Sequence, residues 1–186
     1  MQQLFERQLQ QLSLRADGIV NTGDPVFRIG FGYDAHRFVD ERPLIVGGVE
    51  IPHSRGLKGH SDADVLTHAV IDAILGALAM GDIGRHFPDS DPAYKDIDSL
   101  LMLEKVMGWV KGKALRVNNI DTTVVAEKPK LAPYVMRMQE RFSEILEIPK
   151  EQINIKATTS EGMGFCGRQE GMEAYAVVSL IGVDGR

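Results

Sequence analysis

Cysteine is nearly absent from this sequence, which has a single one, Cys166, among 186 residues. One cysteine excludes a disulfide within the chain and a zinc site built from several cysteines. Low cysteine content is typical of the reducing cytosol, so we expect a cytoplasmic protein. Because no histidine is near it in the sequence to activate the thiol, Cys166 is predicted to be a small packing residue.

Long hydrophobic runs are also missing. The longest apolar run, residues 69–80, contains Asp72 and is shorter than the ~20 residues that span a bilayer. The first residues lack the charged and apolar regions of a secretory signal. We therefore expect no membrane partner.

Basic charge is scarce, with 21 Lys and Arg against 26 Asp and Glu and a formal net charge of -5. Such a chain is not expected to bind nucleic acid, which requires a concentrated basic surface. A phosphorylated ligand would need positive charge from metal ions or backbone amides. The charge balance therefore favours a metal site if the ligand is anionic.

The length suits one domain with a sizeable core. Residues 1–27 differ from the rest, because a Gln-rich stretch is followed by Asp, Gly and Pro residues typical of a loop. We predict a mobile N-terminal extension there, with a short docked helix as the alternative. Residues 28–186 are predicted to form the domain.

Hydrophobic periodicity predicts an α+β fold, an α/β sandwich with a mixed sheet. Gly30 and Gly32 in the first strand indicate close backbone approach or a bulge. Gly47 and Gly48 predict a hairpin turn. The predicted strands are 27–38, 44–46, 49–51, 117–126, 153–157 and 173–183, and the predicted helices are 61–80 (capped by Ser61 or Asp62), 98–112 and 133–146.

Asp34, His36 and His68 are candidate metal ligands. Asp34 and His36 are two residues apart on a strand, so their side chains share a face. His68 lies within the first predicted helix, on a polar row with Asp64 and Asp72, either of which could orient its ring. Two histidines and one aspartate can form a catalytic zinc site with an open position. The alternative is a solvated helix edge.

Three loops carry further polar residues. Residues 81–91 are rich in Gly, Pro and Asp, which is typical of turns and loops. A turn does not by itself explain the number of carboxylates in this segment. Residues 126–133 place lysines and exposed backbone beside a helix start, which suits an anionic or nucleotide ligand, or a solvated loop. Residues 156–165 cluster hydroxyls and one carboxylate at a strand end. Each signal is weak by itself.

Taken in order, these segments resemble the family of 2-C-methyl-D-erythritol 2,4-cyclodiphosphate synthases of the non-mevalonate isoprenoid pathway, over nearly all of residues 28–183. The departures from the family pattern are small and remove no functional side chain: Ala63, Ser160 and Cys166. The segments that carry the resemblance are residues 28–36, 47–52, 60–64 with His68, 81–84, 87–89 with Asp91, 156–159, and 164–165 with 167–168.

The resemblance implies a lyase that closes a cyclic diphosphate and releases CMP from 4-diphosphocytidyl-2-C-methyl-D-erythritol 2-phosphate. It implies zinc on Asp34, His36 and His68, and a second divalent ion, Mg²⁺ or Mn²⁺, on Glu161. It also implies that His60 and Thr159 stabilise the transition state. The implied substrate-binding residues are Asp34, Ala35, His36, His60, Ser61, Asp82, Ile83, Gly84, Phe87, Pro88, Asp89, Ser90, Asp91, Ala126, Glu127, Lys128, Pro129, Lys130, Leu131, Ala132, Thr158, Thr159, Ser160, Glu161, Phe165 and Arg168.

The resemblance further implies a four-stranded mixed sheet with helices on one face, in a homotrimer whose sheets face the threefold axis, in a bacterial cytosol. Active sites would lie between chains. Residues 174–183 are almost continuously apolar, so both faces of that strand need burial, and oligomerisation would cover the second face. Burial within one chain is the alternative.

Two other function classes use the same residues. A different metal-dependent phosphohydrolase would employ the same ligands with water as the attacking group. A non-catalytic isoprenoid diphosphate-binding protein would bind without turnover. The presence of Asp34, His36, His68 and Glu161 argues against a site that has lost its functional residues.

Overall fold

The computed structural model describes residues 26–183, and residues 1–25 and 184–186 lie outside this description. The extension predicted at residues 1–27 therefore falls almost wholly outside the described residues. The domain predicted from residue 28 onward begins with the first strand of a sheet.

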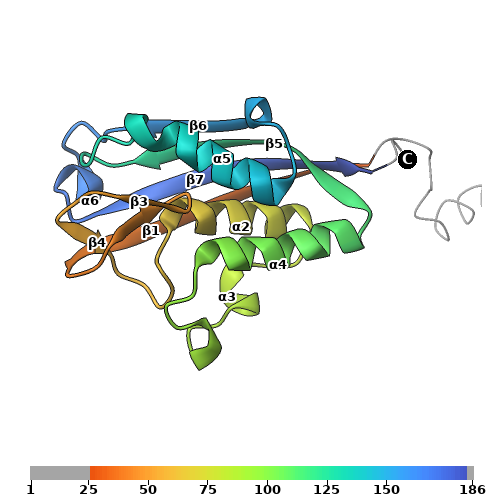
Figure 1. The fold of residues 1–186 in the computed structure, drawn as a ribbon, viewed down its shortest axis with the longest axis horizontal. Helices are drawn as coiled ribbons and strands as arrows, with labels where there is room; N and C mark the ends of the chain where they lie inside the picture. The colour runs from red at the N-terminus through yellow and green to blue at the C-terminus, as the bar shows by residue number, and fades with distance from the viewer. Residues whose placement is uncertain (1–25, 184–186) are drawn as a thin grey trace, which may run out of the picture.

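A mixed sheet of four long strands runs the length of the molecule, with a fifth, three-residue strand at one edge (Figure 1). In sheet order the strands are β4 (Arg55–Leu57), β1 (Phe27–Asp40), β7 (Gly171–Gly182), β5 (Leu115–Val125) and β6 (Ile153–Thr158). β5 and β6 are parallel and the other pairs are antiparallel. The α+β fold class and the mixed sheet predicted from the sequence are thus confirmed, with the short β4 added.

The predicted hairpin is also present, as β2 (Leu44–Val46) paired with β3 (Val49–Ile51). Its turn residues Gly47 and Gly48 both have positive φ, at 59° and 66°, which favours glycine at each position. The side chain of Asp64 accepts hydrogen bonds from both of their amides. The hairpin is therefore tied to the start of the following helix.

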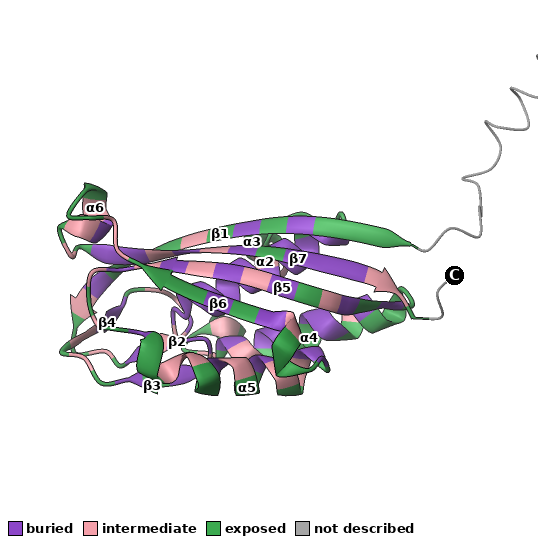
Figure 2. Ribbon diagram, turned by 90° about the horizontal axis from the view of Figure 1, so that it is seen from above, coloured by how far each residue is buried: buried purple, intermediate pink, exposed green. Residues whose placement is uncertain are grey.

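Three helices cover one face of the sheet (Figures 1 and 2): α2 (Val65–Ala77), α4 (Ser99–Gly112) and α5 (Val135–Leu146). α2 lies directly against β1 and β7 and is buried along nearly its whole length. The short helical segments are α3 (Ile83–His86), α6 (Gly164–Gly167) and three 3-10 helices, Pro92–Tyr94, Ala132–Tyr134 and Lys150–Gln152.

The first helix begins later than the sequence suggested. Its N-cap is Asp64, whose carboxylate accepts from the amides of Leu66 and Thr67, and not Ser61 or Asp62. The preceding Ala63 has φ 59°, which is not helical. The helix also ends at Ala77 instead of continuing to residue 80. Similarly, residues 132–134 form a 3-10 turn before α5 starts at residue 135.

The opposite face of the sheet is exposed, and along β1 it is apolar. In β1 the alternate residues Phe27, Ile29, Phe31 and Tyr33 point away from the helices, and Val177 of β7 is exposed beside them. Figure 2 shows this alternation along β1. The sheet thus has one face in the core and a second face that the described chain leaves open to solvent.

Candidate active site

Asp34, His36 and His68 converge at one point between β1 and α2. Asp34 Oδ2 lies 2.8 Å from His36 Nε2 and 2.9 Å from His68 Nδ1. The two ring nitrogens are 3.2 Å apart. The three candidate ligand atoms lie within 4.8 Å of one another, so the structure brings together the set predicted from the sequence.

The hydrogen bonding of His36 fits a metal ligand. Its Nδ1 lies 2.7 Å from the carbonyl oxygen of Lys58, and since a carbonyl can only accept, Nδ1 carries the proton. In the neutral ring the lone pair is then on Nε2, which faces the carboxylate oxygen of Asp34. Two such acceptors at this distance repel each other unless a proton or a metal ion lies between them. The donor set and its ~3 Å spacing therefore fit a cation with metal–ligand bonds of ~2 Å.

The charges of the three residues reinforce each other. Burial by itself raises the pKa of Asp34, but hydrogen bonds with His36 and His68 outweigh it and hold that pKa well below its usual range. Burial lowers the pKa of His36, and the bond and charge of Asp34 reverse this, so the pKa ends above its ordinary value. Asp34 is thus an anion at neutral pH, the state in which a carboxylate binds metal.

The prediction that Asp64 or Asp72 orients the ring of His68 is wrong. Asp64 caps α2 and holds the amides of the hairpin turn, and its Oδ2 also accepts from Thr67 Oγ1 at 2.7 Å. Asp72 accepts from the amide of Ile83 at 2.7 Å. Both carboxylates are used by backbone groups that need a partner at a helix start or loop.

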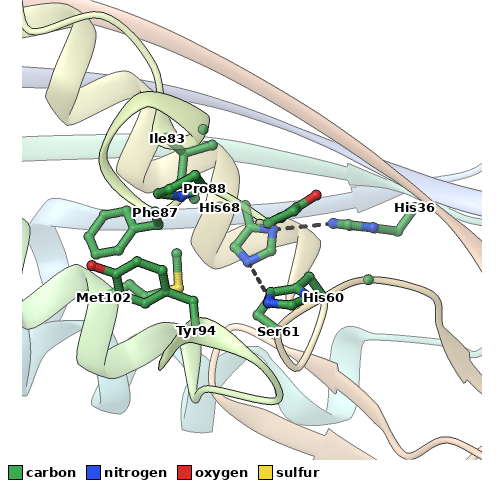
Figure 3. A pocket seen from close by; sticks show the side chains of 12 residues that line it. His36, His60, Ser61, His68, Ile83, Phe87, Pro88, Tyr94 and Met102 are labelled. Atoms are coloured by element: carbon green, nitrogen blue, oxygen red, sulfur yellow. Dashed lines mark hydrogen bonds between the residues drawn. The ribbon is translucent and has the colours of Figure 1, made fainter. Parts of the chain in front are cut away.

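Ser99 and Ser61 contact His68 instead. His68 Nε2 lies 2.8 Å from Ser99 Oγ. It also lies 3.2 Å from Ser61 Oγ, a contact that Figure 3 shows. Sequence reasoning missed Ser99, as it missed Lys58 behind His36. Neither residue has a signal in the sequence, because each contact joins segments far apart in the chain.

A cavity of about 380 Å³ opens beside the ligand cluster (Figure 3). His36 and His68 form one side, and the loop after α2 forms the other. The predicted site residues that line it are His36, His60, Ser61, His68, Ile83, Gly84, Phe87, Pro88 and Asp89, and the sequence analysis missed Gly59, Tyr94 and Met102.

The loop that walls this cavity is held by its own carboxylates. Asp82 caps α3 by accepting from the amide of Arg85 at 3.1 Å, and Asp91 caps the next turn through Ala93. Phe87 is buried and packs edge-on against Tyr94, with ring centroids 5.3 Å apart. Two of the carboxylates in this loop, those of Asp82 and Asp91, are therefore helix caps. Asp89 and its neighbour Ser90 are exposed.

A second, smaller cavity of about 190 Å³ lies at the ends of the parallel strands β5 and β6. Its lining contains most of the predicted nucleotide segment: Ala126, Pro129, Lys130, Leu131, Ala132, Thr158 and Thr159, together with Val124 and Ala157. Glu127 does not line it. Its Oε1 accepts from the amides of Ser160 and Gly162, at 3.0 and 3.2 Å, and so joins the two loops that border the cavity.

Glu161 lies beside this second cavity and not beside the first. Its Oε1 accepts a hydrogen bond from Thr159 Oγ1 at 2.7 Å, and its backbone φ is 53°. Within the described residues, the two cavities share no lining residue. His60 and Thr159 are therefore on different cavities of the same chain.

Comparisons with known proteins identify the family of the chain. A model of the YgbB family matches residues 27–181. The chain belongs to the YgbB family. Relatives named 2-C-methyl-D-erythritol 2,4-cyclodiphosphate synthase include one from Syntrophobacter fumaroxidans, 57% identical over 159 residues, covering 86% of this chain and 99% of the relative. Another, from Syntrophomonas wolfei, is 58% identical over 153 residues, covering 82% and 98%. The family resemblance inferred from the sequence is confirmed.

Solved structures of the same enzymes share the YgbB fold. The bifunctional IspDF from Campylobacter jejuni is 41% identical with a TM-score of 0.83, and the match covers 87% of this chain and 44% of that one. A CDP-bound 2C-methyl-D-erythritol-2,4-cyclodiphosphate synthase is 35% identical with a TM-score of 0.76, covering 82% and 99%. A Plasmodium falciparum IspF in complex with CDP has a TM-score of 0.74 at 33% identity, covering 84% and 96%.

Five further predicted positions in this YgbB chain line neither cavity: Ala35, Lys128, Ser160, Phe165 and Arg168. Phe165 is on α6 and Arg168 follows it, forming an exposed ion pair with Glu170 at 2.8 Å. The hydrogen bond with Glu170, together with its charge, raises the pKa of Arg168. In the part of the chain that the structure describes, no helix has the length and hydropathy of a membrane span.

Proposed function

We propose that this chain converts 4-diphosphocytidyl-2-C-methyl-D-erythritol 2-phosphate to 2-C-methyl-D-erythritol 2,4-cyclodiphosphate and CMP. An oxygen of the 2-phosphate attacks the β-phosphorus, a new P–O bond forms, and the bond from the β-phosphorus to the CMP oxygen breaks. The observation that carries the proposal is the convergence of Asp34, His36 and His68 beside a cavity. Membership in the YgbB family, with relatives of that name, supports the same reaction.

We assign zinc to Asp34, His36 and His68, and a second ion, Mg²⁺ or Mn²⁺, to Glu161. Metal ions there would neutralise phosphate charge, the dominant requirement in phosphoryl transfer. The mixed nitrogen and oxygen ligands favour zinc at the first position, and a lone carboxylate favours a hard ion that keeps most of its waters. An acidic chain that binds a diphosphate is consistent with both assignments.

His60 and Thr159 are proposed to stabilise the transition state through their hydrogen-bonding groups. The ring of His60 reaches into the first cavity, with Nε2 3.3 Å from the carbonyl oxygen of Asp91. Ile83 and Gly84 would hold the sugar phosphate in that cavity, with Asp82 next to them. The other positions assigned to substrate are those implied by the family resemblance.

The second cavity is proposed to hold the cytidine diphosphate part of the substrate. Its lining by the backbone of residues 129–132 and by Thr158 offers fixed donors and acceptors to a base edge and hydroxyls to a phosphate. CDP in two of the related structures supports a nucleotide pocket in this fold.

The assembly proposed is a homotrimer, with the sheets facing the threefold axis and each active site shared between two chains. Two observations support it. The apolar row on β1 leaves one sheet face uncovered in the described chain. The two cavities of one chain share no residue, so a substrate spanning both kinds of site is best accommodated across an interface. We further propose that the enzyme works in the cytoplasm.

Incubation of purified protein with the substrate, with and without a chelator, tests the proposed reaction. We expect the cyclic diphosphate and CMP in equal amounts, detected by ³¹P NMR, and loss of both with chelator or in His36→Ala. A linear phosphate product would identify a metal-dependent phosphohydrolase. Binding without turnover would identify a non-catalytic binding protein.

A further inference from the structure

A chain of hydrogen bonds leads from His68 into the protein through Ser99 and ends at Asp62. His68 Nε2 lies 2.8 Å from Ser99 Oγ, and the Ser99 hydroxyl donates a short hydrogen bond to Asp62 Oδ1. Asp62 Oδ2 accepts from the amide of Ser99 at 3.0 Å. Ser99 is fully buried and His68 nearly so, at 0% and 8% exposure, so the hydrogen bond between these two side chains is shielded from water.

The proton positions in this chain follow from the carboxylate at its end. A serine hydroxyl has one proton, and the Asp62 carboxylate can only accept, so that proton points to Asp62. Ser99 Oγ is then left as an acceptor toward His68, and the ring nitrogen Nε2 must donate. In the neutral imidazole the lone pair is therefore on Nδ1, the atom that faces Asp34.

We propose that Asp62 and Ser99 are positioning residues that fix the tautomer of His68 for metal binding. They act through His68 and touch neither metal nor substrate. Ser61 is a weaker second acceptor, since its Oγ lies 3.2 Å from Nε2 and also accepts from the amide of Ala63. The inference rests on the proposed function only in taking His68 as a metal ligand.

Ser99→Ala and Asp62→Asn should weaken zinc binding by different routes. Ser99→Ala removes the strong acceptor and should raise the zinc dissociation constant about 10–100-fold. Asp62→Asn can turn its amide group toward Ser99, which lets the hydroxyl donate to His68 and places the ring proton on Nδ1. This wrong tautomer blocks the ligand atom, so the loss should be at least as large. The double variant, Ser99→Ala with Asp62→Asn, should lose no more zinc affinity than the weaker-binding single variant, because both changes act through the same chain of hydrogen bonds.

Two measurements on the full chain test the proposal. Chelator competition gives the zinc affinity, and ¹⁵N NMR of histidine-labelled, metal-free protein gives the tautomer of His68, assigned by its loss in His68→Gln. We expect a larger share of protonated Nε2 in the wild type than in Asp62→Asn, because in the metal-free protein the carboxylate of Asp34 favours a proton on Nδ1 in both. Ser143→Ala is the matched control, because it also removes a helical hydroxyl, which donates to the carbonyl of Ile148 at 2.6 Å, and it should change neither readout.

Wild-type protein that binds zinc through His68, together with unchanged affinity and tautomer in both variants, would overturn the inference and leave the proposed function standing. A wild type whose zinc content does not depend on His68 would instead contradict the metal assignment itself. Thermal unfolding of the metal-free variants separates a loss of fold from a loss of tautomer: folded variants with weaker zinc binding and an altered His68 signal support the inference.

Discussion

Gly30 on β1 lies against the main chain of Ala73 on α2, so closely that a Cβ atom at Gly30 would be 1.8 Å from the Ala73 carbonyl oxygen. Gly32 makes the same approach to Ala69, at 2.0 Å. β1 carries Asp34 and His36, and α2 carries His68. The two glycines therefore set the separation between strand and helix at which these side chains meet.

Replacement of Gly30 by alanine should destabilise the protein and disturb the metal site. The new methyl group meets backbone, which has no rotamer to change, so strand and helix must move apart at a cost of about 1–3 kcal/mol. Urea unfolding measures the stability, and elemental analysis measures the retained metal. Gly108→Ala is the control, because Gly108 is exposed on α4 with open space around it, and alanine there should be neutral or stabilising. Equal stability of the two variants would contradict the packing argument.

Removal of one ligand should abolish tight metal binding. We expect one zinc per chain in the wild type and far less in His68→Ala, because the affinity of such a site depends on its full ligand count. Elemental analysis of both proteins, purified in parallel, decides the assignment. Equal zinc content would show that the ion is bound elsewhere. His53→Ala is a suitable comparison, since His53 lies outside the cluster and should leave the zinc content unchanged.

Much of this fold and half of this site could be predicted from local sequence patterns. The spacing of Asp34 and His36 puts them on one face of a strand because side chains alternate, and the strand pairing with β7 bears this out. Gly47 and Gly48 predicted their hairpin for an equally local reason. The choice between the two explanations of Gly30 required the structure: the β1–β7 register runs without a bulge, and helix packing is the cause.

The rest depends on tertiary contacts that no local pattern contains. Asp64 is four residues before His68 on what reads as one helix face, but the structure makes Asp64 the N-cap, where backbone amides take its oxygens. Ser99 reaches His68 because α4 packs beside α2, a neighbour relation fixed by the whole core. Likewise, His60 and Thr159 are separated because the first cavity lies beside β1 and α2, whereas the second lies at the ends of β5 and β6.

The second cavity should prefer cytosine over other bases. Fixed backbone groups of residues 129–132 can pair with one base edge, and a mismatched base would leave buried polar groups unpaired. Calorimetry with CMP, UMP and AMP measures the preference, and we expect CMP to bind at least tenfold tighter, about 1.4 kcal/mol. Comparable affinities for the three nucleotides would remove the base-reading role from this loop.

Cys166 should react slowly with alkylating reagents. Burial, with the nearby charge of Glu173, raises the pKa of its thiol to about 11, so very little thiolate is present at pH 8. Because the thiolate is the reactive form, we expect alkylation of the native protein at pH 8 to be roughly 100-fold slower than in denaturant. The native rate should rise as the pH approaches 11, and in Glu173→Gln it should rise at pH 8. A native rate equal to the denatured rate would contradict the buried, protonated thiol.

The last prediction concerns a site shared between chains. If one chain supplies Asp34, His36 and His68 and its neighbour supplies the loop around Lys130 and Thr158, two different inactive variants should complement each other. His36→Ala chains lack the metal site but keep an intact nucleotide cavity. A nucleotide-loop variant, Lys130→Glu with Thr158→Val, has the reverse defect. When the two are unfolded together and refolded, some interfaces should pair an intact metal site with an intact loop, so activity should return in the mixture and in neither parent.

At equal amounts about one interface in four carries both intact halves, which sets an expected recovery near a quarter of the wild-type activity per chain. Light scattering must show the same oligomer in parents and mixture. Mixed oligomers that contain both chains and remain inactive would place each site within a single chain.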